Sequence, residues 1–237
     1  MQAVILAAGE GRRLRPLTLD RPKPLVEIAG RPLLDHIAAA LPAAIDEIIL
    51  VVGYRGSDIN AHCGSNYFGR PTRYFEQRQP DGNGQALMTA RNALNGRFLV
   101  LFADDLIDGP SLERGLKHEI CLFASEHEAP QNFGVIIANP DGTVADILEK
   151  PANPPSNLVC TSALLLNQEI FPHIKPGRPG QESYLSRAVA ALARRRPIPI
   201  AKMDFWRPVG RPEDIPLAAD ALTRRLTPYR PDARVDR

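Results

Sequence analysis

Apolar runs alternate with helical segments in the first half of the chain. Residues 3–8, 47–52 and 98–103 form nearly continuous apolar runs, and residues 33–44 and 84–94 between them have the pattern of helices. Runs that are apolar throughout are typical of strands covered on both faces of a parallel sheet. Strand, helix and strand in this order form right-handed parallel units. The pattern therefore predicts an α/β fold with a doubly wound, mostly parallel, Rossmann-like sheet, whose ligands gather at the carboxyl ends of the strands.

The pattern changes beyond Asp105, where an antiparallel element enters. Residues 134–138 and 143–148 flank the turn sequence Pro140-Asp141-Gly142, which predicts a β-hairpin. The elements expected after the hairpin are a strand at about 158–166, a helix at about 182–195, a strand at 198–203 and a last helix at 212–226.

We expect residues 1–226 to form a single domain that includes a small antiparallel sub-domain at about 106–200. Residues 227–237 are rich in proline and charge, so they are expected to be a disordered tail.

The composition indicates a globular chain that can bury one sizeable core, with 44% hydrophobic and 24% charged residues among 237. Its net charge of +2, from 29 basic and 27 acidic residues, gives no overall electrostatic field that would attract nucleic acid or a membrane.

The three cysteines and five histidines show no metal-ligand spacing, so we expect free thiols, no zinc site, and surface or helix histidines. No charged leader and no run near the roughly 20 apolar residues of a membrane span is seen, which predicts a cytoplasmic protein.

The most informative local feature follows the first apolar run. Residues 9–18 read Gly-Glu-Gly-Arg-Arg-Leu-Arg-Pro-Leu-Thr, and Lys23 comes soon after, between two prolines. Glycine lets backbone N–H groups approach a polyphosphate, while arginine and lysine neutralise its oxygens. We therefore expect a nucleoside triphosphate as ligand. Leu14 stands where a dinucleotide-binding loop needs its third glycine, and a Walker loop's Gly-Lys-Ser/Thr is absent, so both rival motifs are disfavoured.

Two carboxylates directly follow the apolar run at residues 98–103. Asp104 and Asp105 stand at the carboxyl end of a predicted strand, where the sheet rule places ligands. Carboxylates there predict a site for a hard divalent cation. The alternative is that they only cap a helix that begins near Pro110.

Residues 77–87 mix amide side chains with glycines just before a predicted helix. Amides can read a pyrimidine edge, because each offers both a donor and an acceptor. The alternative is a turn with a helix cap and solvated amides.

In their order along the chain, these motifs resemble the signature of the sugar-1-phosphate nucleotidylyltransferases, the enzymes that make nucleotide sugars. The resemblance also covers Glu149-Lys150-Pro151, which is followed by residues 156–161, and it extends from Met1 to about Leu226. It implies a nucleotidyltransferase that uses Mg²⁺ and joins a nucleoside triphosphate to a hexose 1-phosphate, with release of pyrophosphate. The antiparallel sub-domain is then implied to bind the sugar.

The resemblance also implies roles for individual residues. Asp104 would bind Mg²⁺ with Asp105 in reserve, Lys23 would hold the triphosphate, and Arg13 would stabilise charge at the reacting phosphates. The residues implied to bind the nucleotide are Leu6, Ala8, Gly9 and Gly11 in the first loop, and Gln77, Gly82 and Gln85 at the nucleobase. Those implied to bind the sugar phosphate are Glu149, Lys150 and Thr161. Arg12 stands where the family commonly has a small hydroxyl residue.

The segment at residues 205–214 departs from the family pattern. Pro208 occupies the position of an aspartate that is the family's second metal ligand, and proline cannot coordinate a metal. Asp204 lies four residues earlier, about 13 Å away along an extended strand, and could substitute only if the chain bends. Either the metal is held by Asp104, phosphates and waters, or catalysis is weakened.

The substrates are implied by the resemblance alone. UTP or dTTP with glucose 1-phosphate is expected, and a non-sugar acceptor such as phosphocholine is an alternative. Because of Pro208, a non-catalytic subunit that binds a nucleotide or nucleotide sugar is a second alternative. These enzymes often form dimers or tetramers, so a homo-oligomer is left open, and no nucleic acid or membrane partner is expected.

Overall fold

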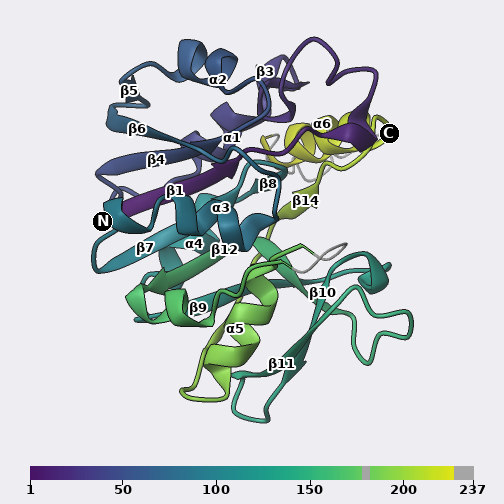
Figure 1. Cartoon of the computed structure of the whole chain (residues 1–237). Coiled ribbons are helices and arrows are strands. Elements are labelled where there is room, and N and C mark those ends of the chain that lie inside the picture. Colours follow the sequence, from purple (N-terminus) through teal and green to yellow (C-terminus); the bar gives the residue numbers. More distant parts are fainter. Residues whose placement is uncertain (178–181, 227–237) are drawn as a thin grey trace, which may run out of the picture.

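The computed structural model describes residues 1–177 and 182–226, and the expected tail at residues 227–237 lies outside them. Within the described residues the chain forms a ten-stranded mixed sheet (Figure 1). The central strands are parallel and lie in the order β7 (Arg97–Phe102), β1 (Gln2–Ala7), β4 (Glu47–Val52) and β6 (Arg70–Glu76). The mostly parallel central sheet predicted from the apolar runs is confirmed.

The antiparallel half continues the same sheet. It joins the parallel strands through β12 (Leu158–Asn167), whose residues 163–167 pair antiparallel with β7. The first residues of β12 pair with β9 and β10. The other strands of this half are β9 (Cys121–Glu126), β10 (Gly134–Ala138), β11 (Val144–Glu149) and β13 (Ile200–Lys202), of which β13 pairs parallel with β9. A hairpin of β10 and β11 forms as predicted, and β12 belongs to both halves of the sheet.

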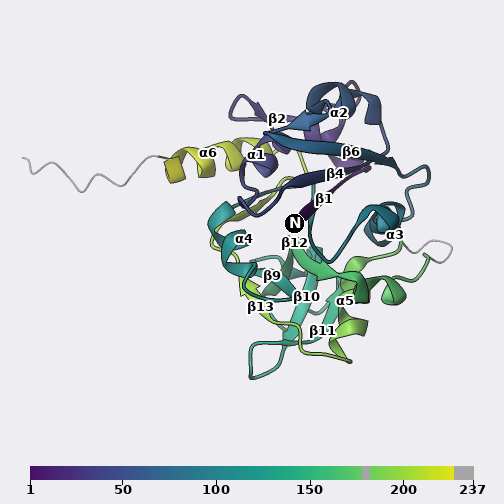
Figure 2. The same ribbon diagram turned by 90° about the vertical axis from the view of Figure 1, so that its left-hand side faces the viewer.

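Helices cover both faces of the sheet. Figure 2 shows α1, α4 and α6 on one side of the strands, and α3 and α5 on the other. Alternate residues of β1 point to the two sides: Ile5 packs in the core that contains α1, and Leu6 packs in the core that contains α3 and α5. The helices are α1 (Leu33–Ala39), α2 (Gly56–Cys63), α3 (Asn83–Thr89), α4 (Gly109–Gly115), α5 (Leu185–Ala193) and α6 (Asp214–Leu226). Because both faces are buried there, β1, β4 and β7 need the nearly continuous apolar sequence that they have.

Several short elements are not predicted by the hydrophobic pattern. The short strands are β2 (Glu27–Ile28), β3 (Arg31–Pro32), β5 (Asn66–Tyr67), β8 (Asp105–Ile107) and β14 (Trp206–Pro208). The 3-10 helices are η1 (Arg12–Leu14), η2 (Lys23–Leu25), η3 (Arg91–Ala93), η4 (Pro130–Asn132) and η5 (Gln168–His173). α1 also ends earlier than expected, at Ala39, because Pro42 cannot continue it and disfavours helical backbone at the residue before.

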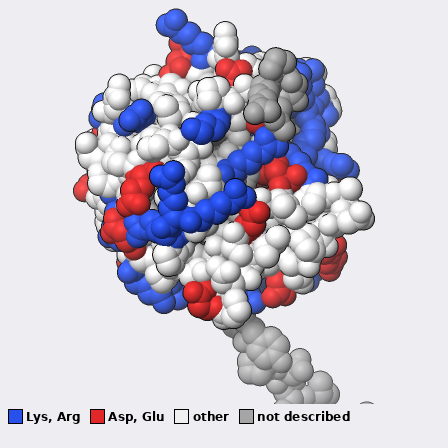
Figure 3. Space-filling model, turned by 60° about the horizontal axis from the view of Figure 1, so that its bottom comes forward, with Lys and Arg blue, Asp and Glu red and all other residues white. Residues whose placement is uncertain are grey.

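The surface has mixed charge. On the face seen in Figure 3, basic and acidic side chains are interspersed, in line with the near balance of 29 basic and 27 acidic residues. In the described part of the chain, no helix combines the length and the apolar character needed to cross a lipid bilayer.

Candidate active site

Two cavities meet at the carboxyl ends of the parallel strands. We call the first, of about 400 Å³, the loop cavity, because the loop at residues 8–13 after β1 lines it. We call the second, of about 580 Å³, the hairpin cavity, because Glu149 and Lys150 at the end of the β10–β11 hairpin line it. The residues that line both are Arg13, Lys23, Asn83, Phe102, Asp104, Glu182 and Gly210. A molecule in one cavity would therefore lie next to a molecule in the other.

The loop after β1 is folded tightly onto the segment that carries Lys23. Gly11 has a φ of +63°, and a Cβ atom there would lie 2.9 Å from Cβ of Lys23. The Thr18 hydroxyl donates a 2.9 Å hydrogen bond to the Gly11 carbonyl and closes the loop. Glycine is required at residue 11 both by this left-handed backbone and by the close approach.

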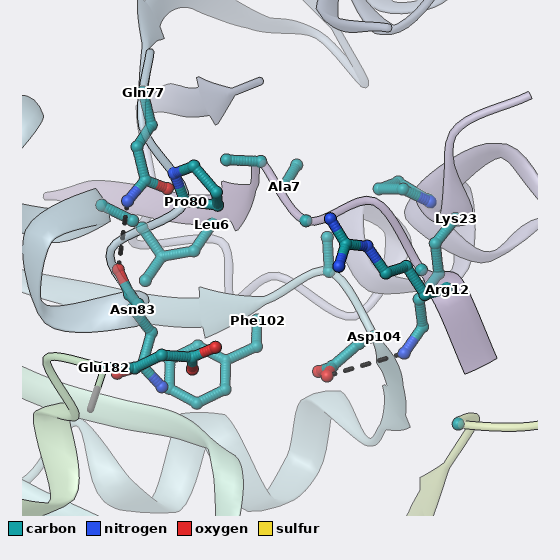
Figure 4. Close-up of a pocket in the computed structure, with 18 of the residues that line it drawn as sticks. Leu6, Ala7, Arg12, Lys23, Gln77, Pro80, Asn83, Phe102, Asp104 and Glu182 are labelled. Atoms are coloured by element: carbon teal, nitrogen blue, oxygen red, sulfur yellow. Dashed lines mark hydrogen bonds and ion pairs between the residues drawn. The ribbon is translucent and has the colours of Figure 1, made fainter. Parts of the chain in front are cut away.

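Lys23 and Asp104 form the centre of the junction between the cavities. Lys23 Nζ lies 3.6 Å from Oδ2 of Asp104, and only 12% of the lysine side chain is exposed (Figure 4). Asp104 Oδ1 is buried and has no hydrogen-bond partner in the structure. An unsatisfied buried carboxylate oxygen is unfavourable, so it has unused capacity to bind a cation or a donor.

Asp105 has a different environment from its neighbour. The indole Nε1 of Trp206 donates a 2.7 Å hydrogen bond to Oδ2 of Asp105. Burial, together with the nearby charge of Asp104, raises the pKa of Asp105 to about 8. Neither aspartate caps α4, because Asp108 accepts that helix's capping hydrogen bond from the Ser111 N–H, at 3.0 Å. The capping alternative for Asp104 and Asp105 is therefore wrong.

Pro208 lies beside these carboxylates but offers no ligand. In the antiparallel pairing of β8 with β14 it is directly opposite Asp105, and the next residue, Val209, donates its N–H to the Asp104 carbonyl at 3.2 Å. Asp204 does not substitute, because its carboxylate pairs with Arg114 at 2.6 Å. Within residues 1–177 and 182–226, no group of three or more His, Cys, Asp or Glu side chains could hold a metal. The site fits a Mg²⁺ ion that has one protein carboxylate and takes its other ligands from phosphates and water.

Arg13 reaches the junction from the loop after β1. A Cβ atom on Gly210 would lie 3.5 Å from a terminal nitrogen of the Arg13 guanidinium. Arg13 and Lys23 thus place two cations where the cavities meet.

The far end of the loop cavity carries the amide segment. Figure 4 shows Gln77 and Pro80 at this end, and Lys23 and Asp104 at the other. Gln77 Nε2 donates to the Gly82 carbonyl at 3.1 Å, which orients the side-chain amide. The nucleotide-site candidates that line this cavity are Leu6, Ala8, Gly9, Gly11, Gln77 and Gly82. Gln85 lies on α3 and is the one candidate of this set that lines neither cavity.

Residues 182–186, which we call the strap, connect the two cavities. Ser183 donates its N–H to the Asp81 carbonyl at 2.9 Å and accepts from the Gly84 N–H at 2.8 Å. The Leu185 N–H donates to Oδ1 of Asn83 at 2.7 Å. These bonds hold residues 182–184 outside the helix, so α5 begins at Leu185 and not at residue 182 as the sequence predicts.

The strap then reaches the hairpin cavity. The Ser186 hydroxyl donates a 2.6 Å hydrogen bond to Oε2 of Glu149, and Lys150 Nζ lies 5.6 Å from the centre of the Tyr184 ring. Sequence reasoning did not find the strap residues Glu182, Tyr184 and Ser186. They lie in no motif, and only the fold of α5 against the β10–β11 hairpin brings them to the site.

The candidates for the sugar phosphate all line the hairpin cavity. Lys150 has a φ of +46°, and its N–H donates to the Phe133 carbonyl at 3.0 Å, so the backbone turns sharply after Glu149. The Thr161 hydroxyl is buried and donates to the Phe123 carbonyl at 2.9 Å. That proton is therefore used inside the fold, and Thr161 can offer a ligand only its oxygen as acceptor.

Aromatic rings form another part of the hairpin cavity's wall. The ring centres of His127 and Phe133 are 4.6 Å apart, and Trp206 lies 5.7 and 5.1 Å from them. Burial lowers the pKa of His127, which favours the neutral ring. The expectation that every histidine is a plain surface or helix residue is therefore wrong for His127.

Comparisons with known proteins agree with this geometry. The sequence profile of the family described as nucleotidyl transferase matches residues 2–225. The UTP-glucose-1-phosphate uridylyltransferase AglF of Haloferax volcanii is 34% identical over 240 residues, which cover 96% of this chain and 98% of that protein. The bifunctional protein GlmU of Methanocaldococcus jannaschii is 36% identical over 220 residues, 91% of this chain and 52% of GlmU. This chain thus spans about half the length of the bifunctional relative.

Two solved structures share the fold. One, from Bacillus anthracis, is assigned as a glucose-1-phosphate thymidylyltransferase and holds sucrose; its TM-score is 0.85 at 24% identity, over 97% of this chain and 98% of that one. The other is a UDP-glucose pyrophosphorylase with UDP-glucose, with a TM-score of 0.82 at 23% identity, over 94% and 98% of the two chains. At these identities the likeness shows the fold alone. Because the profile covers nearly all of the sequence and AglF is matched over nearly its whole length, this chain belongs to the nucleotidyl transferase family.

Proposed function

We propose that this chain transfers a nucleotidyl group from UTP or dTTP to a hexose 1-phosphate, with glucose 1-phosphate favoured as the acceptor. The observation that carries the proposal is the shared junction, where Lys23, Arg13 and Asp104 line both cavities. A triphosphate in the loop cavity and a sugar phosphate in the hairpin cavity would meet there. The similarity to the uridylyltransferase AglF supports UTP and glucose 1-phosphate as the pair.

In the proposed reaction, an oxygen of the acceptor phosphate attacks the α-phosphorus of the triphosphate. A new P–O bond forms while the bond between the α-phosphorus and the departing pyrophosphate oxygen breaks. The reaction needs in-line alignment and charge neutralisation, and it needs no nucleophile from the protein. Lys23 and Arg13 neutralise the triphosphate, Lys150 binds the acceptor phosphate, and Glu149 accepts hydrogen bonds from sugar hydroxyls.

Asp104 is the residue that would hold Mg²⁺, through the buried Oδ1 that has no hydrogen-bond partner within residues 1–177 and 182–226. When bound, Mg²⁺ would supply neutralisation of phosphate charge. Pro208 adds no ligand, so phosphate oxygens and water would complete the coordination.

Pyrophosphate release tests the proposal. The assay crosses UTP, dTTP, CTP, GTP and ATP with the 1-phosphates of glucose, mannose and N-acetylglucosamine, and with phosphocholine, in the presence of Mg²⁺. Turnover with UTP or dTTP and glucose 1-phosphate is expected. No release of pyrophosphate with any of these substrate pairs would overturn the proposal.

A phosphocholine acceptor is a second candidate, favoured by the aromatic wall of the hairpin cavity. The rings of His127, Phe133 and Trp206 could face a quaternary ammonium group, which aromatic faces attract. Turnover with phosphocholine and none with the sugar phosphates would select this acceptor.

A non-catalytic subunit is a third candidate, and Pro208 is the observation that favours it. Such a protein would bind UTP or UDP-glucose in calorimetry and release no pyrophosphate with any of these substrate pairs.

We also propose that residues 1–226 act as one nucleotidyltransferase domain, and that the reaction takes place in the cytoplasm. The free cysteines Cys63, Cys121 and Cys160 support a reducing compartment.

A further inference from the structure

Glu10 and Arg12 form an ion pair at the mouth of the loop cavity, and the proposed mechanism does not use it. Arg12 Nε lies 2.7 Å from one carboxylate oxygen of Glu10, and a terminal guanidinium nitrogen lies 3.0 Å from the other. The pair is bidentate, and its hydrogen bonds hold the pKa of Glu10 below its usual range. Glu10 is therefore an anion at neutral pH.

The two partners differ in their relation to the cavity. Arg12 lines the loop cavity, and Glu10 does not. In Figure 4 the Arg12 side chain extends across the cavity at the end where Lys23 and Asp104 lie, opposite the Gln77 end. A nucleotide whose base lies near Gln77 would thus direct its phosphates toward Arg12.

The ion pair can be exchanged at low cost. The Arg12 side chain is 72% exposed, and exposed ion pairs contribute little to stability because water screens them. Arg15 also approaches Glu10, at 3.6 Å, so the carboxylate keeps a cationic partner when Arg12 leaves. A phosphate offers the guanidinium the same two-oxygen geometry as Glu10, with more negative charge.

We propose that Arg12 binds the β- or γ-phosphate of the triphosphate, and that Glu10 is the counter-ion from which Arg12 is exchanged when the nucleotide binds. This inference rests on the proposed function, since it requires a triphosphate in the loop cavity. It makes Arg12 a substrate-binding residue, and Glu10 a competitor of the substrate for the same guanidinium.

Calorimetric titration of the full chain with UTP, UMP and inorganic pyrophosphate tests the proposal. Arg12→Gln is expected to weaken UTP and pyrophosphate binding about tenfold and to change UMP binding less than about twofold. Glu10→Gln is expected to tighten UTP binding about two- to fivefold, because the competitor is gone. In the double variant the gain from Glu10→Gln should be smaller than in the single variant, since the competition for Arg12 is gone and only the weaker contact with Arg15 is left.

Arg21→Gln is the matched control. Arg21 lies between η1 and η2, pairs with Asp20 at 3.3 Å and lines neither cavity, so its loss removes the same charge at a different place. UTP binding should stay within about twofold of wild type at constant ionic strength. An equal loss in Arg21→Gln and Arg12→Gln would overturn the proposal, because it would mean a general charge effect.

The outcomes separate this inference from the proposed function. If the wild type binds and turns over UTP, and Arg12→Gln binds UTP equally well, the inference about Arg12 is overturned and the proposed function is not. An Arg12→Gln loss that is as large for UMP as for UTP would place the contact at the α-phosphate and contradict the assignment. Wild type that binds neither a triphosphate nor pyrophosphate would overturn both.

Discussion

The loop cavity and the hairpin cavity are built by different means. The loop cavity has a glycine-bearing wall: Gly9, Gly11 and Gly82 line it, and a Cβ atom would clash at Gly11 and Gly82. The hairpin cavity is lined by polar side chains that come from separate elements, such as Glu149 of β11, Thr161 of β12 and Ser186 of α5.

This difference has a consequence for specificity. A wall of backbone groups depends on close approach, so side chains cannot be exchanged there without moving the chain. A wall of side chains can change its ligand by substitution while the fold stays the same. We therefore expect the nucleotide end of the site to be hard to alter and the acceptor end to be adaptable.

The largest expected effect comes from the residue that both cavities share. Asp104→Asn removes the carboxylate charge at the junction and should lower kcat by at least about a hundredfold with any substrate pair. The fold should survive, because Oδ1 has no hydrogen-bond partner among the described residues and Oδ2 lies 3.6 Å from Lys23, outside the distance of a strong hydrogen bond. Steady-state pyrophosphate release gives the rate, and circular dichroism checks the fold. An unchanged rate would remove Asp104 from the proposed reaction.

The buried Asp105 should make stability depend on pH. Its pKa is raised to about 8, above that of an unfolded chain, so the folded state keeps a proton that the unfolded state releases at lower pH. At acid pH both states hold this proton, so Asp105 does not lower the free energy of unfolding. As the pH rises toward 8, the free energy of unfolding decreases by at most about 1.4 kcal/mol per pH unit.

Asp105→Asn should remove this dependence, because the amide oxygen still accepts from Trp206 and does not titrate. Urea unfolding of both proteins at pH 6 and pH 8 measures the difference. Equal pH slopes in the two proteins would contradict the raised pKa.

The backbone contact between the strap and α3 should not tolerate an added methyl group. In Gly84→Ala the new Cβ would lie 2.4 Å from Oγ of Ser183, and overpacking of this kind costs about 1 to 3 kcal/mol. That loss should exceed the gain of about 0.5 to 1 kcal/mol that alanine offers in a helix.

A second substitution, at Ser183, tests whether the clash is the cause of the loss. Ser183→Ala removes the clashing oxygen, so the double variant should recover part of the free energy of unfolding. Only part is expected, because the new Cβ would still be 3.1 Å from the Ser183 carbonyl, and because Ser183→Ala also removes the 2.7 Å hydrogen bond from Oγ to the Lys175 carbonyl. A single variant as stable as wild type would show that the strap can shift.

The smallest expected effect is on the KM of the acceptor, and it comes from a substitution in the hairpin cavity. Ser186→Ala removes the 2.6 Å hydrogen bond to Glu149 and should raise the KM for the acceptor about five- to tenfold, with the KM for the nucleotide unchanged. Ser186→Thr keeps the hydroxyl and should restore most of the acceptor KM. Equal changes in both KM values would mean that the two cavities do not respond separately.

The sequence predicts the parallel core well and the strap poorly. β1, β4 and β7 begin and end within one residue of the predicted runs, because a strand buried on both faces must be apolar throughout. The strap is a different case, since residues 182–184 have helical sequence but stay outside the helix through hydrogen bonds to Asp81 and Gly84. Those partners are about a hundred residues away in the sequence, so no local pattern predicts them.

The same contrast holds within the candidate site. The glycine loop could be located from the sequence, because a close approach of two chain segments restricts a position to glycine, as at Gly11. The positions of His127 and Trp206 could not, because their rings come together only through the pairing of β14 with β8 and the packing around Phe133. Gln85 shows the limit of motif reading: it shares the segment of Gln77 and Gly82, but it lines neither cavity.

The shared strand β12 has a consequence for how the molecule opens. Residues 163–167 of β12 pair with β7 of the parallel half, Val159 pairs with β10, and β9 pairs with both ends of β12. Separating either half from β12 would break the backbone hydrogen bonds that join the two halves. The amide protons of β12 and β7 should therefore exchange with solvent only when the whole sheet unfolds. Both cavities are thus attached to one continuous sheet, and we expect them to be lost in the same unfolding event.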